Sequence, residues 1–572
     1  MITKEDVIKK LELFSTCLEL SGANIFKVRA YHNASISLES VQNFKELIGE
    51  RKLHTIRGIG NDISHQIYEL NETGNIKALK DLKSSLPDGL FYMLKIEGLG
   101  PKRVRALYKE LKIDNLKKLK KACEGGTLLK LNGFGPVLRS NILKGIEFLE
   151  KNSQRYTVDI ATDISEKVIK KLKTLSKISK IEIAGSLRRK RETVKDIDIL
   201  ISGASPDEVS KKISDMKEFK EFISKGDTKI SFKLRNGFHV DIRIVKDNEF
   251  VTALHHFTGS KEHNVQLRHL SKEFDIKINE YGLEKKEKVI HPESEEELFN
   301  ILNMEYIPPE LREGRGELEA AKKNRIPKLI QLSDLKGIVH VHTLFSDGKN
   351  TLEELADFVK RSGFSYIVVT DHSQSSRIAN GMKLDKLHFY LSEIDSINKK
   401  YGEKVLVKGI ECDILTSGEL DYPNHVLENF EVVIGSVHSG FSMDKASMTK
   451  RLLRAIDNPY MNVLGHISGR LLTKRKAYDF DKEKVFSSAI DSGVYLEINS
   501  NPYRLDVDWR YIKNLKEAGM KFLITPDAHS IEDIENIKYG VGIARKGWLE
   551  EKDVINTHEV YDFLKALKGV KA

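Results

Sequence analysis

GSLRRKRETVKDIDILI, residues 185–201, places a glycine-serine turn ahead of a short loop and an apolar strand. Asp196 and Asp198 are two positions apart on that strand, so their carboxylates point the same way. Asp241 lies on a second strand pattern, 239–245. Carboxylates aimed at one point repel one another unless cations lie between them, and oxygen ligands of this kind suit Mg²⁺ or Mn²⁺. The three aspartates therefore predict a catalytic site that holds two divalent ions.

The residues around these aspartates suit a substrate that carries phosphate. Gly185 and Ser186 offer backbone and hydroxyl donors, and Arg189 can neutralise developing charge. A pair of aspartates alone is more often a polar strand end, but the turn, the pair and the later aspartate together resemble the nucleotidyltransferase superfamily. A helix over 163–175 and a hairpin turn at 235–237 complete an α+β nucleotidyltransferase palm, whose strands we expect at 181–184, 197–201, 228–234 and 239–245.

Residues 256–281 narrow the choice within that superfamily. The run HFTGS at 256–260, followed by Asn264, Arg268 and INEY at 278–281, resembles the nucleotide-binding subdomain of DNA polymerase beta and its family X relatives. The resemblance implies that Phe257 packs on the incoming nucleotide, Asn264 touches the base edge and Arg268 faces the template. Gly259 and Ser260 would line the sugar. The implied nucleotide-binding set is Arg155, Gly185, Ser186, Arg189, Phe257, Gly259, Ser260, Asn264 and Arg268.

Three glycine turns punctuate the first 150 residues, in which helical patterns cover 7–20, 61–70 and 101–111. A Gly-x-Gly turn between helices lets backbone N–H groups approach a phosphate of any DNA sequence. One such turn would be a weak signal, but three in a basic, helical region resemble helix-hairpin-helix motifs. The resemblance also implies a monovalent cation bound at these motifs. The implied DNA-binding residues are Gly58, Gly60, Gly98, Gly100, Gly133 and Gly135.

Two positions depart from the family pattern. His256 stands where family X polymerases often have tyrosine, which bears on discrimination against ribonucleotides. Gln66 stands where polymerase beta has the lysine that forms a Schiff base with an abasic sugar. Because an amide cannot form that imine, we do not expect lyase activity at this position.

The second half alternates apolar strand patterns with helical stretches, which predicts a parallel sheet or barrel with its catalytic residues at the carboxyl ends of the strands. Histidines and acids follow strand after strand there. A lone histidine at a strand end is usually structural, but this repetition predicts bound metal, since clustered imidazoles and carboxylates would otherwise be unpaired. The strands are expected at 337–342, 366–370, 405–410, 432–436, 463–465, 495–498 and 522–525.

The histidine pattern resembles the PHP domain (polymerase and histidinol phosphatase), an α/β distorted (β/α)7-type barrel that binds up to three metal ions. Mixed nitrogen and oxygen donors suit Mn²⁺, Zn²⁺ or Fe²⁺ better than Mg²⁺ alone, and such ions generate hydroxide for phosphoester cleavage. Arg470 is a candidate phosphate clamp. The resemblance implies nine metal ligands, His340, His342, Asp347, His372, Glu411, His438, His466, Asp527 and His529.

Length and composition are compatible with this multidomain architecture. At 572 residues, the chain is too long for one core, and its net charge of +10 favours an anionic partner such as nucleic acid. Three scattered cysteines indicate neither a disulfide framework nor a cysteine zinc site. The N-terminus lacks an apolar signal core, and no apolar run approaches the roughly 20 residues that span a bilayer. We expect a monomeric cytoplasmic protein with no membrane partner.

The resemblance divides the chain in the order of bacterial and archaeal family X polymerases. It predicts an all-α region made of an N-terminal helix-hairpin-helix domain at 1–85 and a second such subdomain at 86–152. The remaining predicted parts are the palm at 153–250, the nucleotide-binding subdomain at 251–315, a charged helical linker at 316–335 and the PHP domain at 336–572.

This organisation implies a DNA-directed DNA polymerase that fills short gaps in base excision repair, from gapped or primed duplex DNA and deoxynucleoside triphosphates. The PHP domain would add a metal-dependent 3'-5' exonuclease or 3'-end phosphoesterase, with abasic-site endonuclease activity as a further implication. One alternative is a template-independent nucleotidyltransferase fused to a small-molecule phosphatase. Another is a DNA-binding scaffold with relic sites, although the complete ligand set disfavours it.

Overall fold

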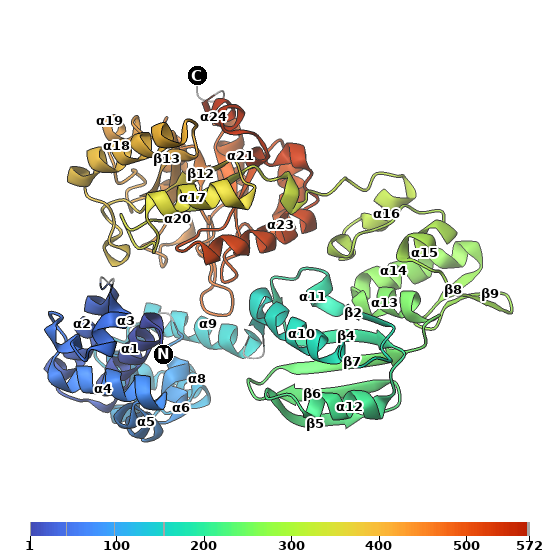
Figure 1. The fold of residues 1–572 in the computed structure, drawn as a ribbon, viewed down its shortest axis with the longest axis horizontal. Coiled ribbons are helices and arrows are strands. Elements are labelled where there is room, and N and C mark those ends of the chain that lie inside the picture. The colour runs from blue at the N-terminus through green and yellow to red at the C-terminus, as the bar shows by residue number, and fades with distance from the viewer. Residues whose placement is uncertain (1, 40, 42, 97, 153–154, 569–572) are drawn as a thin grey trace. The chain divides into compact units, whose positions relative to one another are not determined.

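The computed structural model describes residues 2–39, 41, 43–96, 98–152 and 155–568 (Figure 1). The chain divides into two compact units, Met1–Ser153 and Gln154–Ala572. Glu97, in the second glycine turn, lies outside the described residues. None of the described helices combines the length and apolar character needed to cross a membrane. The finer division into six parts remains a prediction.

The first unit is helical and surrounds one apolar core. The hydroxyl of Thr3 accepts a hydrogen bond from the first turn of α1, and Gly22, in the left-handed conformation, ends that helix. The helices predicted at 7–20, 61–70 and 101–111 are confirmed as α1, α4 and α7. The α-helices of this unit are α1 (Lys4–Ser21), α2 (Ile25–Glu39), α3 (Phe44–Gly49), α4 (Asn61–Thr73), α5 (Lys77–Ser84), α6 (Asp88–Met93), α7 (Pro101–Leu111), α8 (Leu116–Glu124) and α9 (Pro136–Asn152).

The second unit begins with a five-stranded mixed sheet of order β2-β4-β7-β6-β5. The predicted strands are confirmed as β2 (Lys180–Ile183), β4 (Asp196–Ser202), β6 (Lys229–Leu234) and β7 (His239–Val245). The sequence pattern does not predict β5 (Phe219–Lys225), because this edge strand is mostly exposed and lacks apolar alternation.

The helices of this sheet region include α10 (Val158–Leu172), α11 (Gly185–Arg188) and α12 (Pro206–Ser214). The helix predicted over 163–175 is α10, which starts earlier because its buried stripe begins at Val158. Next come the helices α13 (Phe250–Thr258), α14 (Lys261–Ser271) and α15 (Glu295–Ile301), with the small sheet β8 (Ile276–Ile278), β9 (Leu283–Lys285) and β10 (Lys288–Ile290).

The charged stretch after Arg312 is less helical than its composition indicates. The helix α16 covers only Glu317–Lys322. Arg312 is fully buried and pairs with Glu295 at 2.5 Å, and Leu318 packs in the same core. This stretch therefore starts as a packed part of the fold, because its charges are neutralised in the interior.

Seven parallel strands in the order β11 to β17 form the rest of the second unit. All seven predicted strands are confirmed, as β11 (Gly337–Val341), β12 (Tyr366–Val369), β13 (Leu406–Asp413), β14 (Val432–Ser436), β15 (Val463–Leu464), β16 (Tyr495–Asn499) and β17 (Phe522–Thr525). A parallel bridge between Val341 and Ala528 links the first strand to the segment after the last, so the barrel is nearly closed. The helices are α17 (Leu352–Ser362), α18 (Leu384–Tyr401), α19 (Asn424–Leu427), α20 (Lys445–Ile456), α21 (Lys482–Asp491), α22 (Trp509–Glu517), α23 (Ile537–Lys546) and α24 (Val560–Lys568).

Ion pairs join the barrel to the part of this unit that precedes it in the chain. Arg510 on α22 lies 3.1 Å from the buried carboxylate of Glu192, and Arg545 on α23 lies 2.8 Å from Glu310. Burial alone would raise the pKa of Glu192, but the guanidinium groups of Arg510, Arg191 and Arg470 outweigh burial and lower that pKa to about 2.

The low pKa of Glu192 predicts an acid-sensitive interface. A carboxyl whose folded pKa is depressed stabilises the fold above its unfolded pKa of 4.5, and this contribution disappears as the pH falls toward 2. Glu192→Gln should therefore reduce the free energy of unfolding at pH 7 by at most about 3 kcal/mol. Urea unfolding of this variant should also depend less on pH between 5 and 3 than that of the wild type. The exposed Glu221→Gln is the control, and equal pH dependence in all three proteins would contradict the assignment.

Candidate active sites

The palm aspartates lie on two neighbouring strands at the centre of the mixed sheet. The strands β4 and β7 are parallel neighbours, and their register places Asp198 opposite Asp241 and Asp196 opposite His239. Burial, followed by repulsion from Asp196 and Asp241, raises the pKa of Asp198 to about 6. A Cβ at Gly185 would lie 2.1 Å from the carboxylate of Asp198, so only glycine fits there. The site thus concentrates negative charge that divalent cations can neutralise.

A cavity of about 520 Å³ opens beside these carboxylates. Ser260 is buried and caps α14, where its Oγ accepts a hydrogen bond from the His263 N–H, and Arg155 instead donates to Thr193 at 2.8 Å. Neither Ser260 nor Arg155 lines the cavity. The predicted residues that line it are Gly185, Ser186, Arg189, Asp196, Asp198, Phe257, Gly259, Asn264 and Arg268.

The structure adds residues to the cavity that the sequence pattern does not single out. Arg243 lines it with its guanidinium 4.2 Å from the centroid of the Phe257 ring, and Lys261 also lines it. Arg243 could have been found, because it lies two residues after Asp241 on the same face of β7. Lys261 lies at the start of α14, and only the fold brings it to the cavity.

Asn264 has an unused acceptor. Its Nδ2 donates to the carbonyl of His256 at 2.7 Å, whereas its Oδ1 is buried without a hydrogen-bond partner. A buried polar atom without a partner costs free energy. The cavity can therefore offer this carbonyl to a ligand that carries an N–H group.

The nine ligand-type residues of the barrel come together at the carboxyl ends of its strands. They fall into four overlapping groups whose donor atoms lie within 4.8 Å of one another. Glu411 belongs to two of these groups, and one of its carboxylate oxygens, Oε1, lies 2.9 Å from His466 Nε2, 3.3 Å from His438 Nε2 and 3.4 Å from His340 Nε2. The groups together contain His340, His342, Asp347, His372, Glu411, His438, His466, Asp527 and His529.

Unpaired buried atoms indicate that these residues fit metal ions. Both ring nitrogens of His342 and the Nε2 of His340 are buried without a hydrogen-bond partner. Burial lowers the pKa of His342 to about 3, helped by the neighbouring His529 and His372, so the ring is neutral. A neutral imidazole with free nitrogens, beside clustered carboxylates, is the form in which a histidine such as His342 ligates a divalent metal.

Two acids that sequence analysis missed hold predicted ligands in place. Glu497 lies 2.5 Å from Nδ1 of His340, and Asp413 lies 2.5 Å from Nδ1 of His438. Burial opposes protonation of His438, but Glu411 and Asp413 outweigh it and raise the pKa to about 10. Such carboxylate-histidine contacts orient metal ligands. Asp413 could have been found two residues after Glu411, whereas Glu497 lies in an otherwise apolar strand.

The predicted phosphate clamp, Arg470, is held by the loops of the barrel. Its Nε donates to the carbonyl of Arg504 at 2.8 Å, and its NH1 lies 3.2 Å from Asp508. Arg504, in contrast, lies 3.3 Å from Oδ2 of the predicted ligand Asp527. Arg504 is therefore a second candidate for contact with phosphate at this site, and the role of Arg470 remains a prediction.

The three glycine turns of the first unit share one backbone geometry. The first glycine of each turn, Gly58, Gly98 or Gly133, is left-handed, with φ of +96°, +84° and +81°. A Cβ at the second glycine, Gly60, Gly100 or Gly135, would meet no atom within 4 Å. The backbone there is open to a phosphate, and DNA contact remains a prediction. Gln66, on α4, accepts a hydrogen bond from the hydroxyl of Tyr31 at 2.9 Å.

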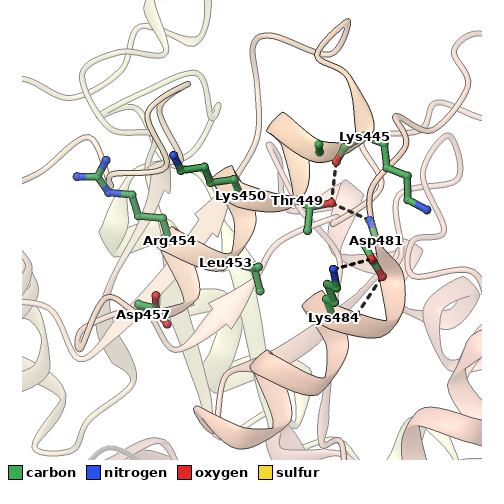
Figure 2. Close-up of a pocket in the computed structure, with 9 residues that line it drawn as sticks. Lys445, Thr449, Lys450, Leu453, Arg454, Asp457, Asp481 and Lys484 are labelled. Carbon is green, nitrogen blue, oxygen red and sulfur yellow. Dashed lines mark hydrogen bonds and ion pairs between the residues drawn. The ribbon is translucent and has the colours of Figure 1, made fainter.

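A further hollow of about 640 Å³ lies on the outside of the barrel, between α20 and α21 (Figure 2). Three of its charged side chains are paired: Lys484 lies 3.6 Å from Asp481, and Arg454 lies 2.6 Å from Glu419 outside the lining. None of the predicted metal ligands or nucleotide-binding residues lines it.

Together the two sites define an enzyme that joins a carboxylate-based nucleotidyltransferase to a divalent-metal barrel. Family models agree, matching a DNA polymerase beta thumb at 253–313, a PHP domain at 339–501, a helix-hairpin-helix domain at 2–76 and a SAM-like helix-hairpin-helix tandem at 91–147. The DNA polymerase/3'-5' exonuclease PolX of Bacillus subtilis (strain 168) is 37% identical over 569 residues, 99% of each chain. This chain belongs to the family X DNA polymerases that carry a C-terminal PHP domain.

The barrel alone is also similar to proteins named probable phosphatases. The one from Thermoanaerobacter sp. (strain X514) is 27% identical over 242 residues, which are 40% of this chain and 94% of the relative. The one from Caldanaerobacter subterraneus subsp. tengcongensis is 27% identical over 229 residues, 38% of this chain and 85% of the relative.

Proposed function

We propose that this chain is a DNA polymerase that fills short gaps in base excision repair and carries a 3'-5' exonuclease in its barrel. The observation that supports this most strongly is the pairing of two intact constellations on one chain. Three aspartates share adjacent strands of the palm, and nine ligand-type side chains gather at one end of the barrel. The full-length similarity to a DNA polymerase/3'-5' exonuclease supports the same assignment.

In the palm, Asp196, Asp198 and Asp241 would hold two divalent ions, Mg²⁺ or Mn²⁺, which when bound activate the primer hydroxyl and stabilise the leaving group. The protein's own residues bind the deoxynucleoside triphosphate in the cavity. Arg189 and Ser186 bind its phosphates, and Oδ1 of Asn264 accepts a hydrogen bond from the base or an intervening water. The proposed roles of Phe257 and Gly259 against the base and sugar, and of Arg268 beside the template, come from the family resemblance.

In the barrel, the nine ligands would hold up to three ions, for which Mn²⁺, Zn²⁺ and Fe²⁺ are the candidates, and these supply a hydroxide for cleavage of the 3'-terminal phosphodiester. Glu497 and Asp413 keep His340 and His438 in the orientation that ligation needs. Arg504 would neutralise charge on the bound phosphate.

Abasic-site incision is assigned to the barrel as part of this proposal. Gln66 cannot form a Schiff base with an abasic sugar, so the N-terminal region would bind DNA through its glycine turns without lyase chemistry. A monovalent cation at those turns and a monomeric state complete the proposal. The matches to a polymerase thumb and to helix-hairpin-helix domains favour templated synthesis on duplex DNA over a nucleotidyltransferase-phosphatase fusion.

A gapped duplex tests the proposed function. On a 5'-phosphorylated substrate with a single-nucleotide gap, the templated nucleotide should be incorporated at least about tenfold faster than on the same primer left single-stranded, because the duplex orients the primer end. Mg²⁺ and Mn²⁺ are compared in parallel, and a non-complementary nucleotide is the control. Equal extension of single-stranded and gapped primers, without regard to the template base, would support the template-independent alternative instead.

A further inference from the structure

A lysine of the barrel is buried against the wall of the nucleotide cavity. Lys546 ends α23, and its side chain is 0% exposed. Its Nζ donates to the carbonyl of Arg189 at 2.9 Å, to the carbonyl of Glu310 at 3.3 Å and to Oε1 of Glu313 at 2.6 Å. An ammonium group has three N–H donors, so every donor of this barrel residue is directed to the polymerase part of the chain.

Glu313 links Lys546 to Arg189, which lines the cavity. The same oxygen that accepts from Lys546 lies 3.1 Å from Nε of Arg189, and the second oxygen lies 3.2 Å from NH1 of Arg191. Arg189 also donates through NH1 to the carbonyl of Thr258, next to the cavity. The guanidinium of Arg189 is therefore fixed along two edges, one by Thr258 and the other by the carboxylate that Lys546 holds.

Stability alone does not explain a charged group in this position. A buried ion pair repays its desolvation cost poorly, and an apolar side chain of similar volume would often serve as well. Burial lowers the pKa of Lys546 to about 8, while Glu313 opposes this shift, so the group remains charged at neutral pH. Trp509 packs against it, with the ring centroid 4.5 Å from Nζ. The interface thus keeps a buried, charged contact that ends on Arg189.

We propose that Lys546 is a positioning residue for polymerisation: through Glu313 it fixes the guanidinium of Arg189 for the triphosphate of the incoming nucleotide. The inference rests on the proposed function, because it needs Arg189 to bind that triphosphate. It also makes nucleotide binding in one active site depend on the barrel that carries the other. The exonuclease site takes no part in this contact, so its chemistry is unaffected.

The test compares steady-state gap filling by full-length Lys546→Met, Lys546→Arg and the wild type. Lys546→Met should raise KM for the deoxynucleotide about tenfold or more, with a smaller change in kcat, since Arg189 loses its fixed orientation before the chemical step. The exonuclease rate and the affinity for gapped DNA should stay at wild-type values. Lys546→Arg keeps the charge and should recover part of the loss.

Two further variants separate positioning from folding. Lys516→Met removes a lysine that pairs with Glu550 and Asp553 inside the barrel, and it should leave KM unchanged. Glu313→Gln keeps Lys546 and should raise KM in the same way, and neither change should add to the effect of Arg189→Ala, because all three act on one group.

The outcomes separate this inference from the proposed function. An unchanged KM in both Lys546→Met and Glu313→Gln would overturn the inference. An equal fall of the polymerase and exonuclease rates in Lys546→Met, with a wild-type KM, would also overturn it. A wild type that fails to fill the gap at all would instead overturn the proposed function.

Discussion

Asp198→Asn is expected to slow nucleotide incorporation by about a thousandfold or more while leaving the exonuclease rate within about twofold of the wild type. Asp198 shares its strand with Asp196, lies opposite Asp241 and lines the cavity, so under the proposed function its carboxylate would ligate the ions. Asparagine keeps the shape but loses the charge. Single-turnover incorporation into a gapped duplex measures the loss, with the exposed Asp227→Asn as the matched control.

The stability of the metal-free protein shows whether this loss is local. The pKa of Asp198 is raised to about 6, above its unfolded value of 3.8, so ionised Asp198 destabilises the fold at higher pH. The asparagine variant should therefore unfold at a higher temperature than the wild type at pH 8 without metal, and Mn²⁺ should stabilise it less. Simultaneous loss of stability and of both activities would contradict a separate polymerase site.

Glu411→Gln should lower the exonuclease rate by about a thousandfold or more. It should also lower the metal content of the protein, while polymerisation continues. Glu411 approaches three histidines through one oxygen, so an amide at this position removes a charge shared by two of the ligand groups. Metal stoichiometry measured by mass spectrometry and release of 3'-terminal nucleotides report the two effects.

Glu419→Gln is the matched control for this change, because Glu419 is an exposed barrel acid paired with Arg454. It should keep both the metal content and the exonuclease. If Glu411→Gln bound as much metal as the wild type, the assignment of the nine ligands would be wrong.

Local patterns predicted most of the fold. The seven barrel strands are short apolar runs followed by polar residues, and the palm strands alternate clearly, so both follow from the chain itself. The edge strand β5 lacks that signal because its side chains face solvent. The charged stretch after Arg312 indicated a helical linker, but only Glu317–Lys322 is helical. Charge composition cannot show that Glu295 lies inside the fold and neutralises the guanidinium of Arg312.

The sequence predicted those parts of the candidate sites that consist of ligand-type residues at strand ends. Glu497 could not be recognised, because a single acid in an apolar strand looks the same whether or not a histidine lies against it. The contact of Lys546 with Arg189 joins residues 357 positions apart, and only the packed structure brings them together. Ser260 lies in a family motif and was predicted to line the sugar, but here its side chain caps the helix α14.

One time course tests directly whether this chain carries two separate active sites. A gapped duplex with a labelled primer is incubated with Mn²⁺, with and without deoxynucleotides, and product lengths are followed for the wild type, Asp198→Asn and Glu411→Gln. Asp198→Asn should only shorten the primer, and Glu411→Gln should only extend it. Loss of both shortening and extension in either folded variant would contradict two separate active sites.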